Sequence, residues 1–523
     1  MTLAAVICCT LNMTVLTSCT DDEANPMPSP EPKDLAEYTI LYYANGGANV
    51  DNCIIPMLAD FYEANPEAYK KVNVVVQYKF STTENMLEQA DEMEEFTPQL
   101  CEMFGSKTVR WAIDPTKTLR AQLYSRNNIY GKDNADCTCP DSLTNFINWA
   151  TKAYPAKKYM LVVNDHGGGY VPHDELPEQA ASRTRGLLYD DGYPVPDEQD
   201  KHFTAKSFHR AVAAANVRFE TIYLLACLMN NLEYQFELQD LCDYIIASTY
   251  TMPAWGGALD VLPGILSQTD VDIERALDAY CQSDVASWDD FYSNDEEYSE
   301  DDPFYTDLTV TKTANIAHLG MVMREFVDRL CDTYQNGTEA QRQAIDDCTS
   351  AAVKVELNSP YYDVAKYMSS IMKTLPEVYD DDFYNQMREA FNSCILAQYF
   401  SKYLTTHQYM VDYSVLLGAE GAYSVVLWED DEELDKDMPN YEMSYCADGT
   451  KEGYNIILSD DYEYLESIFD EQLSPWGSTL ADTYEQLAFD RAVGWSRWLY
   501  LNRQAPSLFC PKDLHYKLPM PED

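Results

Sequence analysis

Short apolar runs alternate with segments of helical period between residues 38 and 238, and this alternation constrains the fold more than any other feature of the chain. The runs at 159–163 and 221–226 are continuously apolar, which is typical of strands buried on both faces of a parallel sheet. The sequence therefore predicts an α/β layer fold with a mostly parallel sheet. The expected strands are 38–44, 72–78, 109–113, 159–163 and 221–226, and the expected helices are 49–63, 142–153, 203–214 and 233–238.

Two of the predicted strands end in unusual sequences. Residues 164–170 read Asn-Asp-His-Gly-Gly-Gly-Tyr, and residues 226–231 read Ala-Cys-Leu-Met-Asn-Asn. Ligands of parallel sheets bind just beyond the carboxyl ends of the strands. We therefore expect His166 and Cys227 to belong to one functional site.

The residue types at these two strand ends favour nucleophilic chemistry. A thiol at the start of a helix has a lowered pKa because the helix dipole favours the thiolate, and a neighbouring histidine can take or return its proton. The glycines after His166 leave backbone amides free to donate where an oxyanion develops. Taken separately, Cys227 is typical of a core thiol and His166 of a turn. Together, at the ends of consecutive strands, they predict a thiol hydrolase.

Both segments resemble the two signature blocks of the clostripain family of cysteine peptidases, which are relatives of gingipains, legumains and caspases. The resemblance implies a caspase-like α/β/α sandwich with a C-terminal helical elaboration, and hydrolysis of peptide bonds. It makes Cys227 the nucleophile, through a thioester acyl-enzyme, and His166 the general acid/base. The amides of Gly167 and Cys227 would form the oxyanion hole. Further blocks agree in order, so that the resemblance spans most of residues 38–503; they are 38–51, 244–249, 253–256, 421–427 and 484–499.

Two positions inside these blocks bear on the substrate. The family commonly has an acid two residues before the nucleophile and another in the block that follows it, and its preference for Arg or Lys is linked to acidic pocket residues. Leu225 and Tyr250 stand at those two places here. We therefore expect little or no preference for Arg or Lys, and a neutral or apolar substrate pocket bordered by Trp255.

The second half of the chain carries mainly helical periods. We interpret residues 38–300 as the caspase-like catalytic core and residues 301–523 as a C-terminal helical region with a returning strand and a closing helix. The expected helices are 314–334, 341–356, 361–374, 382–405 and 484–499, and the expected strands are 304–311 and 425–428.

The formal charge of the chain is −51, from 36 Lys and Arg against 87 Asp and Glu. Nucleic-acid binding depends on cations that neutralise phosphates, so no nucleic-acid partner is expected. The 15 cysteines are irregularly spaced, and we expect most to be buried and inert. Cys137 and Cys139 lack a second ligand pair, so no metal site is predicted. The acidic stretch 284–302 lacks the order of an EF-hand loop and is interpreted as a solvated linker, with calcium the one cofactor left open.

The N-terminal residues predict export. Residues 2–18 form an apolar stretch shorter than the about 20 residues of a membrane-spanning helix, as expected for a signal peptide. The sequence Leu-Thr-Ser-Cys that ends at Cys19 resembles the bacterial lipobox, whose cysteine is lipidated and becomes the mature N-terminus. We expect a signal peptide at 1–18, lipidation at Cys19, an acidic and proline-rich tether at 19–37, and attachment to the cell envelope at the outer membrane, with exposure at the surface.

A function of another class also remains open. A surface lipoprotein could keep the peptidase fold to bind peptide or glycan without cleaving it, and Leu225 and Tyr250 favour that alternative. The presence of both Cys227 and His166 favours the peptidase, because binding alone requires no nucleophile and base. A zinc hydrolase is a third alternative, but no His-Glu-x-x-His or comparable spacing occurs. The expected function is a cysteine endopeptidase that acts on peptide or protein substrates.

Overall fold

The computed structural model describes part of the chain. The described residues are 35–47, 50–90, 93, 96–125, 129–132, 134–169, 186–190, 202–253, 257–268, 270–293, 306–352, 361–407, 414–416, 441–443, 456–458 and 486–504. The predicted signal peptide, Cys19, most of the tether, Trp255 and the predicted strand 425–428 lie outside these ranges. Among the described helices, none has the length and apolar character that crossing a membrane requires.

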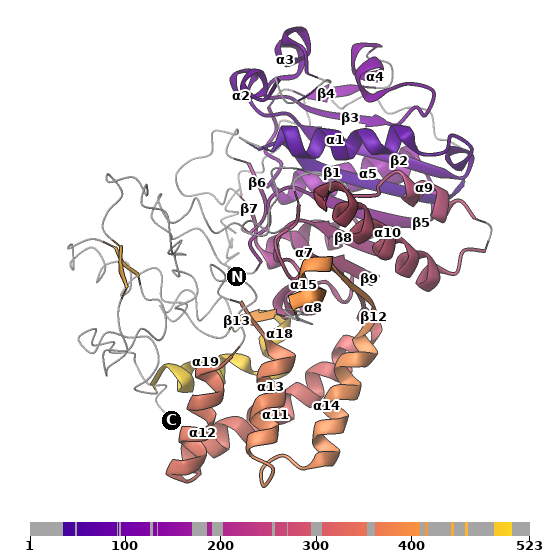
Figure 1. Cartoon of the computed structure of the whole chain (residues 1–523). Helices are drawn as coiled ribbons and strands as arrows, with labels where there is room; N and C mark the ends of the chain where they lie inside the picture. The colour runs from indigo at the N-terminus through magenta and orange to yellow at the C-terminus, as the bar shows by residue number, and fades with distance from the viewer. Residues whose placement is uncertain are drawn as a thin grey trace, which may run out of the picture.

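Nine strands of the described chain form one sheet, in the order β12-β10-β9-β8-β5-β1-β2-β3-β4 (Figure 1). The five central strands, from β9 to β2, run parallel to one another, and antiparallel strands extend both edges. This sheet confirms the predicted α/β fold. The strands are β1 Ala36–Asn45, β2 Val72–Lys79, β3 Thr108–Ala112, β4 Tyr130–Lys132, β5 Ala156–Asn164, β8 Phe219–Leu225, β9 Cys242–Ala247, β10 Asp307–Lys312 and β12 Ile395–Phe400.

Helices cover both faces of the sheet and produce three layers (Figure 1). Along β1, Leu41 and Tyr43 enter the core on one face, and Tyr42 and Ala44 enter the core on the other. Burial on both faces is the reason that these strands read as continuous apolar runs. The first core is covered by α5 Pro140–Ala153, α7 Ala205–Ala214, α8 Leu232–Leu238 and α11 Ile316–Asn336, and the second by α1 Asp51–Glu63, α9 Val261–Leu266 and α10 Ile273–Ser293.

Shorter elements complete the described chain. The helices α2 Thr83–Glu88, α3 Pro98–Phe104 and α4 Leu119–Ser125 surround the β2–β4 edge (Figure 1), and β6 Leu187–Tyr189 pairs with β7 His202–Phe203. The remaining elements are α12 Glu339–Ser350, β11 Tyr361–Asp363, α13 Val364–Thr374, α14 Asp381–Cys394, α15 Lys402–His407, β13 Ser414–Leu416, β14 Tyr441–Met443, β15 Ile456–Leu458, α18 Ala488–Val493 and α19 Trp495–Gln504.

The C-terminal half differs from the prediction in several places. The helix expected over 341–356 ends at Ser350, and residues 361–363, expected to begin a helix, form β11. The helix expected over 382–405 ends at Cys394, and the next six residues form β12. Antiparallel pairing with β10, and burial of Ala397 against the second core, outweigh the helical period there. The closing helix is two helices, because Gly494 has a φ of 73°, a left-handed conformation that glycine adopts at no steric cost.

The interpretation of 284–302 as a solvated linker is wrong for its first ten residues. Residues 284–293 belong to α10, and Asp284 is buried. Its carboxylate accepts hydrogen bonds from the Ala258 N–H at 2.6 Å and from the Tyr223 hydroxyl at 3.0 Å. These two donors replace the water that a linker carboxylate would bind.

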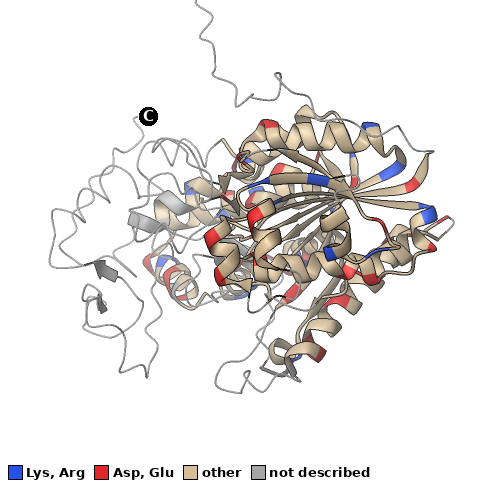
Figure 2. Ribbon diagram, turned by 90° about the horizontal axis from the view of Figure 1, so that it is seen from above, with Lys and Arg blue, Asp and Glu red and all other residues tan. Residues whose placement is uncertain are grey.

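The acidic residues are spread along helices and loops on several sides of the described structure (Figure 2). Some pair with nearby cations, as Glu37 does with Lys157 at 2.7 Å and Asp243 with Arg218 at 2.7 Å. Exposed pairs of this kind contribute at most about 1 kcal/mol. Over the described residues, the negative charge is therefore spread across the surface (Figure 2).

Candidate active site

The two predicted strand ends meet at one edge of the sheet. β5 and β8 are parallel neighbours, and their last residues, Asn164 and Leu225, are register partners. The chain leaves both strands at the same level, toward His166 from one and toward Cys227 from the other. A β-carbon on Gly167 would lie 2.2 Å from the Cys227 carbonyl oxygen and 2.7 Å from the Cys227 nitrogen. The backbone of the His166 turn therefore touches the backbone of Cys227, and glycine is required at position 167.

Cys227 differs from most other described cysteines in its exposure. It is partly exposed, as is Cys53, whereas the other eight described cysteines are buried. Burial raises the pKa of Cys137 to about 12 and that of Cys331 to about 11, because a thiolate is poorly solvated there. Such thiols are inert at neutral pH. The prediction that most cysteines are buried is confirmed for the described residues.

A backbone amide contacts the Cys227 sulfur, and Cys227 does not lie at the start of a helix. α8 begins at Leu232 with Asn231 as its N-cap, so Cys227 lies more than a turn before the helix. The dipole acts only within about one turn of the helix end, and the predicted contribution of this helix is therefore wrong. The N–H of Met252 donates to the Cys227 Sγ at 3.2 Å. A hydrogen bond to the charged form of a thiol favours that form.

The residue after Cys227 has a strained backbone. Leu228 has a φ of 62°, in a left-handed region that costs a residue other than glycine about 1–3 kcal/mol. Its N–H donates to the Tyr250 carbonyl at 2.9 Å, and its carbonyl accepts the Asn231 Nδ2 at 2.9 Å. These bonds hold Cys227 in a turn that its own sequence does not favour.

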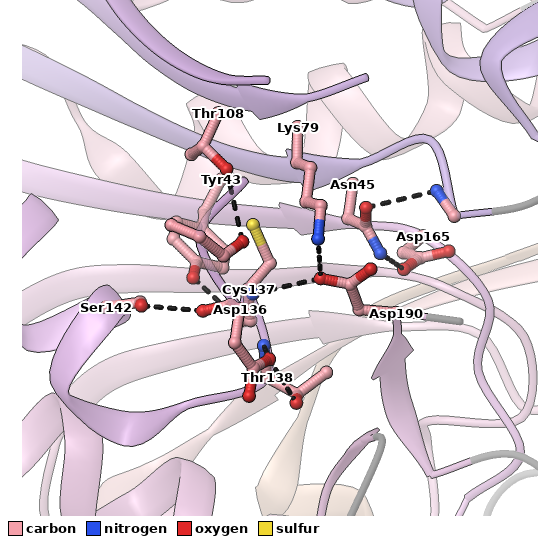
Figure 3. Close-up of polar contacts among 12 residues, drawn as sticks. Tyr43, Asn45, Lys79, Thr108, Asp136, Cys137, Thr138, Ser142, Asp165 and Asp190 are labelled. Atoms are coloured by element: carbon pink, nitrogen blue, oxygen red, sulfur yellow. Dashed lines mark hydrogen bonds and ion pairs between the residues drawn. The ribbon is translucent and has the colours of Figure 1, made fainter. Parts of the chain in front are cut away.

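Hydrogen bonds on two sides position the His166 turn. The Asp165 carboxylate accepts the His166 N–H at 2.6 Å. It also accepts the Asn45 Nδ2 at 3.2 Å (Figure 3). The His166 carbonyl accepts the Leu188 N–H at 3.0 Å. Within the described ranges, the N–H of Gly167 has no hydrogen-bond acceptor. This amide can therefore donate to a substrate carbonyl.

A buried ion pair also supports the turn that carries His166. Lys79, the last residue of β2, pairs with Asp190, and each side chain is 1% exposed (Figure 3). Asp190 also accepts the Cys137 N–H at 3.2 Å. Burial raises the pKa of Asp190, and Lys79 opposes that shift. Asp190 lies two residues after Leu188, which bonds His166, so the ion pair anchors the histidine side of the site to the sheet.

Sequence reasoning missed Asn45 and Lys79. They are register partners at the ends of β1 and β2. Each is a polar residue that closes an apolar run, and that signal could have identified them. The Met252 contribution comes from a backbone amide, for which no residue type provides a signal.

The two predicted substrate residues that the structure describes are buried. Leu225 is 3% exposed and packs in the core beneath α1 and α10. Tyr250 is 2% exposed, and its N–H donates to the Ser248 Oγ at 3.1 Å. Both belong to the packed frame around Cys227. Among the described residues, no three His, Cys, Asp or Glu side chains form a group that could hold a metal ion.

Comparisons with known proteins agree with this geometry. The model of the clostripain family matches residues 124–466, about two thirds of the chain. A search of curated protein sequences gave no match. The structure of iotapain, a secreted C11 cysteine protease from Bacteroides thetaiotaomicron, is 14% identical, covers 88% of this chain and 100% of its own, and has a TM-score of 0.51. A structure of a secreted C11 cysteine protease from the same organism with an irreversible peptide inhibitor is 16% identical, covers 88% and 99%, and has a TM-score of 0.51.

The fold is thus that of the caspase-like C11 cysteine proteases. The chain belongs to the clostripain family. It is a cysteine peptidase, an enzyme that acts on peptide or protein substrates, and the predicted family and enzyme class are confirmed.

Proposed function

We propose that this peptidase is an endopeptidase in which Cys227 is the nucleophile and His166 the general acid/base. The observation that carries the proposal is the contact between Gly167, the neighbour of His166, and the backbone of Cys227. The partial exposure of Cys227 and the amide that Met252 directs at its Sγ support the same assignment. A thiolate with a histidine on the adjacent strand end is what nucleophilic catalysis requires.

The reaction proceeds through a thioester. The Cys227 thiolate attacks the scissile carbonyl carbon, a C–S bond forms, and the oxygen becomes an oxyanion that the amides of Gly167 and Cys227 stabilise. The C–N bond then breaks as the His166 imidazolium gives its proton to the leaving amine. A water molecule, deprotonated by His166, attacks the thioester carbonyl, and the C–S bond breaks to release the carboxylic acid and the thiolate.

We further propose a neutral or apolar side chain at the residue before the cleaved bond. Leu225 and Tyr250 are buried around Cys227, and neither can pair with a guanidinium or an ammonium group. Leu225 and Tyr250 would act by leaving the pocket without a carboxylate, and Trp255, outside the described residues, is the proposed contact with the substrate. The overall negative charge attracts cationic peptides at long range, but it does not build a pocket.

A peptide-library cleavage profile of residues 34–523 tests both proposals, with Cys227→Ala as the inactive control. We expect cleavage after neutral or apolar residues, and none by the control. An Arg substrate cleaved faster than every other would contradict the specificity. Cleavage by the Cys227→Ala variant would contradict the nucleophile.

Labelling by iodoacetamide near neutral pH separates the peptidase from a binding protein of the same fold. We expect Cys227 to react faster than ordinary thiols, and this excess to disappear in a His166→Ala variant. Labelling of Cys227 that is neither fast nor dependent on His166 would favour a protein that binds peptide or glycan without cleaving it.

We propose that the reaction needs no cofactor, because Cys227 and His166 supply the nucleophile and the proton transfer. Treatment with EDTA should leave kcat/KM unchanged. A loss of activity that added calcium restores would instead assign a calcium requirement.

We also propose that the protein is an envelope lipoprotein, anchored in the outer membrane through Cys19 and exposed at the surface. The apolar stretch 2–18 and the lipobox-like sequence support this proposal, and the neighbouring structure with the C11 fold is of a secreted protease. Cells fed radiolabelled fatty acid should label the wild-type protein and not a Cys19→Ser variant. Equal labelling of both would contradict it.

A further inference from the structure

A short segment after β9, residues 248–252, holds the turn that carries Cys227. Four of its five residues hydrogen-bond to that turn, three of them through backbone atoms and Thr249 through its hydroxyl. The turn contains the strained Leu228, so it keeps its shape only while its surroundings hold it. The position of this segment therefore determines where the Cys227 thiol lies. The three bonds through backbone atoms run from the Asn230 N–H to the Ser248 carbonyl (2.7 Å), from the Leu228 N–H to the Tyr250 carbonyl (2.9 Å) and from the Met252 N–H to the Cys227 Sγ (3.2 Å).

One buried carboxylate holds the 248–252 segment in place. Asp307 is the first residue of β10 and is 0% exposed. Its two oxygens accept five hydrogen bonds, four of them from the segment. The donors are the Ser248 Oγ (2.9 Å), the Thr249 N–H (2.6 Å), the Thr249 Oγ1 (3.0 Å), the Tyr250 N–H (3.3 Å) and the Thr309 Oγ1 (3.2 Å).

The charge of Asp307 is compensated by these donors. Among the described residues, no Lys, Arg or His forms an ion pair with it. Burial raises the pKa of Asp307 to about 6, and the hydrogen bonds from Ser248 and Thr249 oppose that shift. A buried carboxylate without a cation is stable only while its donors stay in place. The carboxylate and the conformation of the segment therefore stabilise each other.

Thr249 links Asp307 directly to the nucleophile turn. Its Oγ1 donates to Asp307 at 3.0 Å and accepts the Asn230 Nδ2 at 2.9 Å. The neighbour of Asp307, Thr306, donates from its Oγ1 to the Thr251 carbonyl at 3.0 Å. The start of β10 thus fixes both the middle and the end of the segment.

We propose that Asp307 is a positioning residue that keeps Cys227 reactive. It holds the 248–252 segment so that the Met252 N–H points at the Cys227 Sγ and the Leu228 turn keeps its left-handed backbone. This inference rests on the proposed role of Cys227 as the nucleophile. It also makes β10, which lies beyond the boundary predicted at residue 300, a working part of the catalytic edge.

The variant Asp307→Asn, in the full chain, tests this role. It keeps the size of the side chain but replaces an acceptor oxygen by a donor, so that several segment donors lose their partner. We expect kcat to fall about 10- to 100-fold, the range in which small displacements of a catalytic group act, with KM little changed. We also expect the pH profile of Cys227 alkylation by iodoacetamide to move upward by about one pH unit, because the thiolate loses its donor.

Asp490→Asn is the matched control. Asp490 is 6% exposed, burial raises its pKa, and it accepts the Ser496 N–H at 2.7 Å, but it lies in α18. Per folded molecule, this variant should change neither kcat nor the alkylation profile. A lower melting temperature for Asp307→Asn with both quantities unchanged would show that Asp307 only stabilises the fold, and would overturn the inference.

Thr249→Val is a milder second variant. It removes the relay from Asp307 to Asn230, keeps the shape of the side chain and leaves the carboxylate in place. We expect kcat to fall about 3- to 10-fold and the alkylation profile to move upward by less than in Asp307→Asn, and this variant decides the question if Asp307→Asn does not fold. If the wild-type chain cleaves no peptide, the proposed function fails, whereas the alkylation profiles still show whether Asp307 positions the thiol.

Discussion

The turns that carry His166 and Cys227, the two residues proposed for catalysis, are built alike but supported differently. Each depends on a leucine in the left-handed region: Leu188, whose N–H bonds the His166 carbonyl, has a φ of 61°, and Leu228 has a φ of 62°. A buried carboxylate supports each of them, Asp190 on the histidine side and Asp307 on the cysteine side. The difference lies in what compensates each carboxylate.

Asp190 is paired with the buried Lys79, whereas Asp307 accepts hydrogen bonds from backbone and hydroxyl donors. An ion pair neutralises the charge but joins only two points of the chain. A carboxylate that accepts several backbone donors orders a whole segment, at the cost of a desolvated charge. The histidine turn is therefore anchored to the sheet at separate points, through Lys79 at the end of β2 and Asn45 at the end of β1, and the cysteine turn is shaped residue by residue.

Removing either proposed catalytic side chain should lower kcat more than any other change. It tests the residue that each of the two turns carries. We expect Cys227→Ala and His166→Ala each to lower kcat by about 10⁴-fold or more, with the fold unchanged. Cys53→Ala is the control, because Cys53 is the other partly exposed thiol among the described residues. Steady-state kinetics with circular dichroism decide the result, and substantial activity in Cys227→Ala would refute the assignment.

Separating the two turns is the next largest change. A β-carbon in Gly167→Ala would lie 2.2 Å from the Cys227 carbonyl oxygen, so the turns must move apart. We expect kcat to fall about 10²-fold or more, because a displacement of about 1 Å has effects of this size. Gly264→Ala, in α9, has no atom within 4 Å of the added carbon and should leave kcat unchanged. Equal activity of the two variants would mean that the contact at Gly167 has no catalytic importance.

Breaking the ion pair tests the histidine side. Lys79→Met leaves the Asp190 charge buried without a cation and should lower the free energy of unfolding by about 3–5 kcal/mol. Adding Asp190→Asn removes that charge and should restore most of the loss. Lys157→Met, in the exposed pair with Glu37, is the control and should cost at most about 1 kcal/mol. Denaturant unfolding measures the wild type, the single variants Lys79→Met and Asp190→Asn, their double variant and the control, and additive effects of the two changes would contradict the coupling.

The pH dependence of stability should show the smallest effect and separates the two carboxylates. The pKa of Asp307 is raised from 3.8 to about 6, so its stabilising contribution is fully present below about pH 4 and is lost as the pH rises through about 6. The loss amounts to at most about 3 kcal/mol. Asp307→Asn should therefore gain stability relative to the wild type between pH 4 and pH 7, by denaturant unfolding. Asp190→Asn should gain less stability over the same pH range, because Lys79 opposes the rise in the pKa of Asp190. An equal gain in the two variants would contradict the difference between the two carboxylates.

Much of the fold could be predicted because its signals are local. The runs that form β5 and β8 are buried on both faces, and burial by itself demands apolar residues at every position. β12 could not be predicted, because six residues after α14 become a strand only where β10 offers an open edge. Asp284 was misread for a similar reason, since its donors, Ala258 and Tyr223, come from distant parts of the chain.

Some residues of the candidate site could likewise be predicted from the sequence, and others could not. His166 and Cys227 stand out because rare residue types follow two apolar runs directly, and the order of parallel strands brings such ends to one edge. The supports of the site have a weaker signal or none. Lys79 closes an apolar run, but Asp307 and Asp190 are ordinary charged residues in the sequence, and their burial and their partners identify these two only in the structure.

The sequence by itself determined the layer architecture, the family and the two residues proposed for the chemistry, because each depends on patterns within a few neighbouring residues. The tertiary structure alone decided how the two turns are held, which amide faces the Cys227 thiol, and that the start of β10 holds the 248–252 segment. The physical reason is that a buried polar group must find its partners wherever the fold places them. Those partners are set by strand order, and the local sequence does not record it.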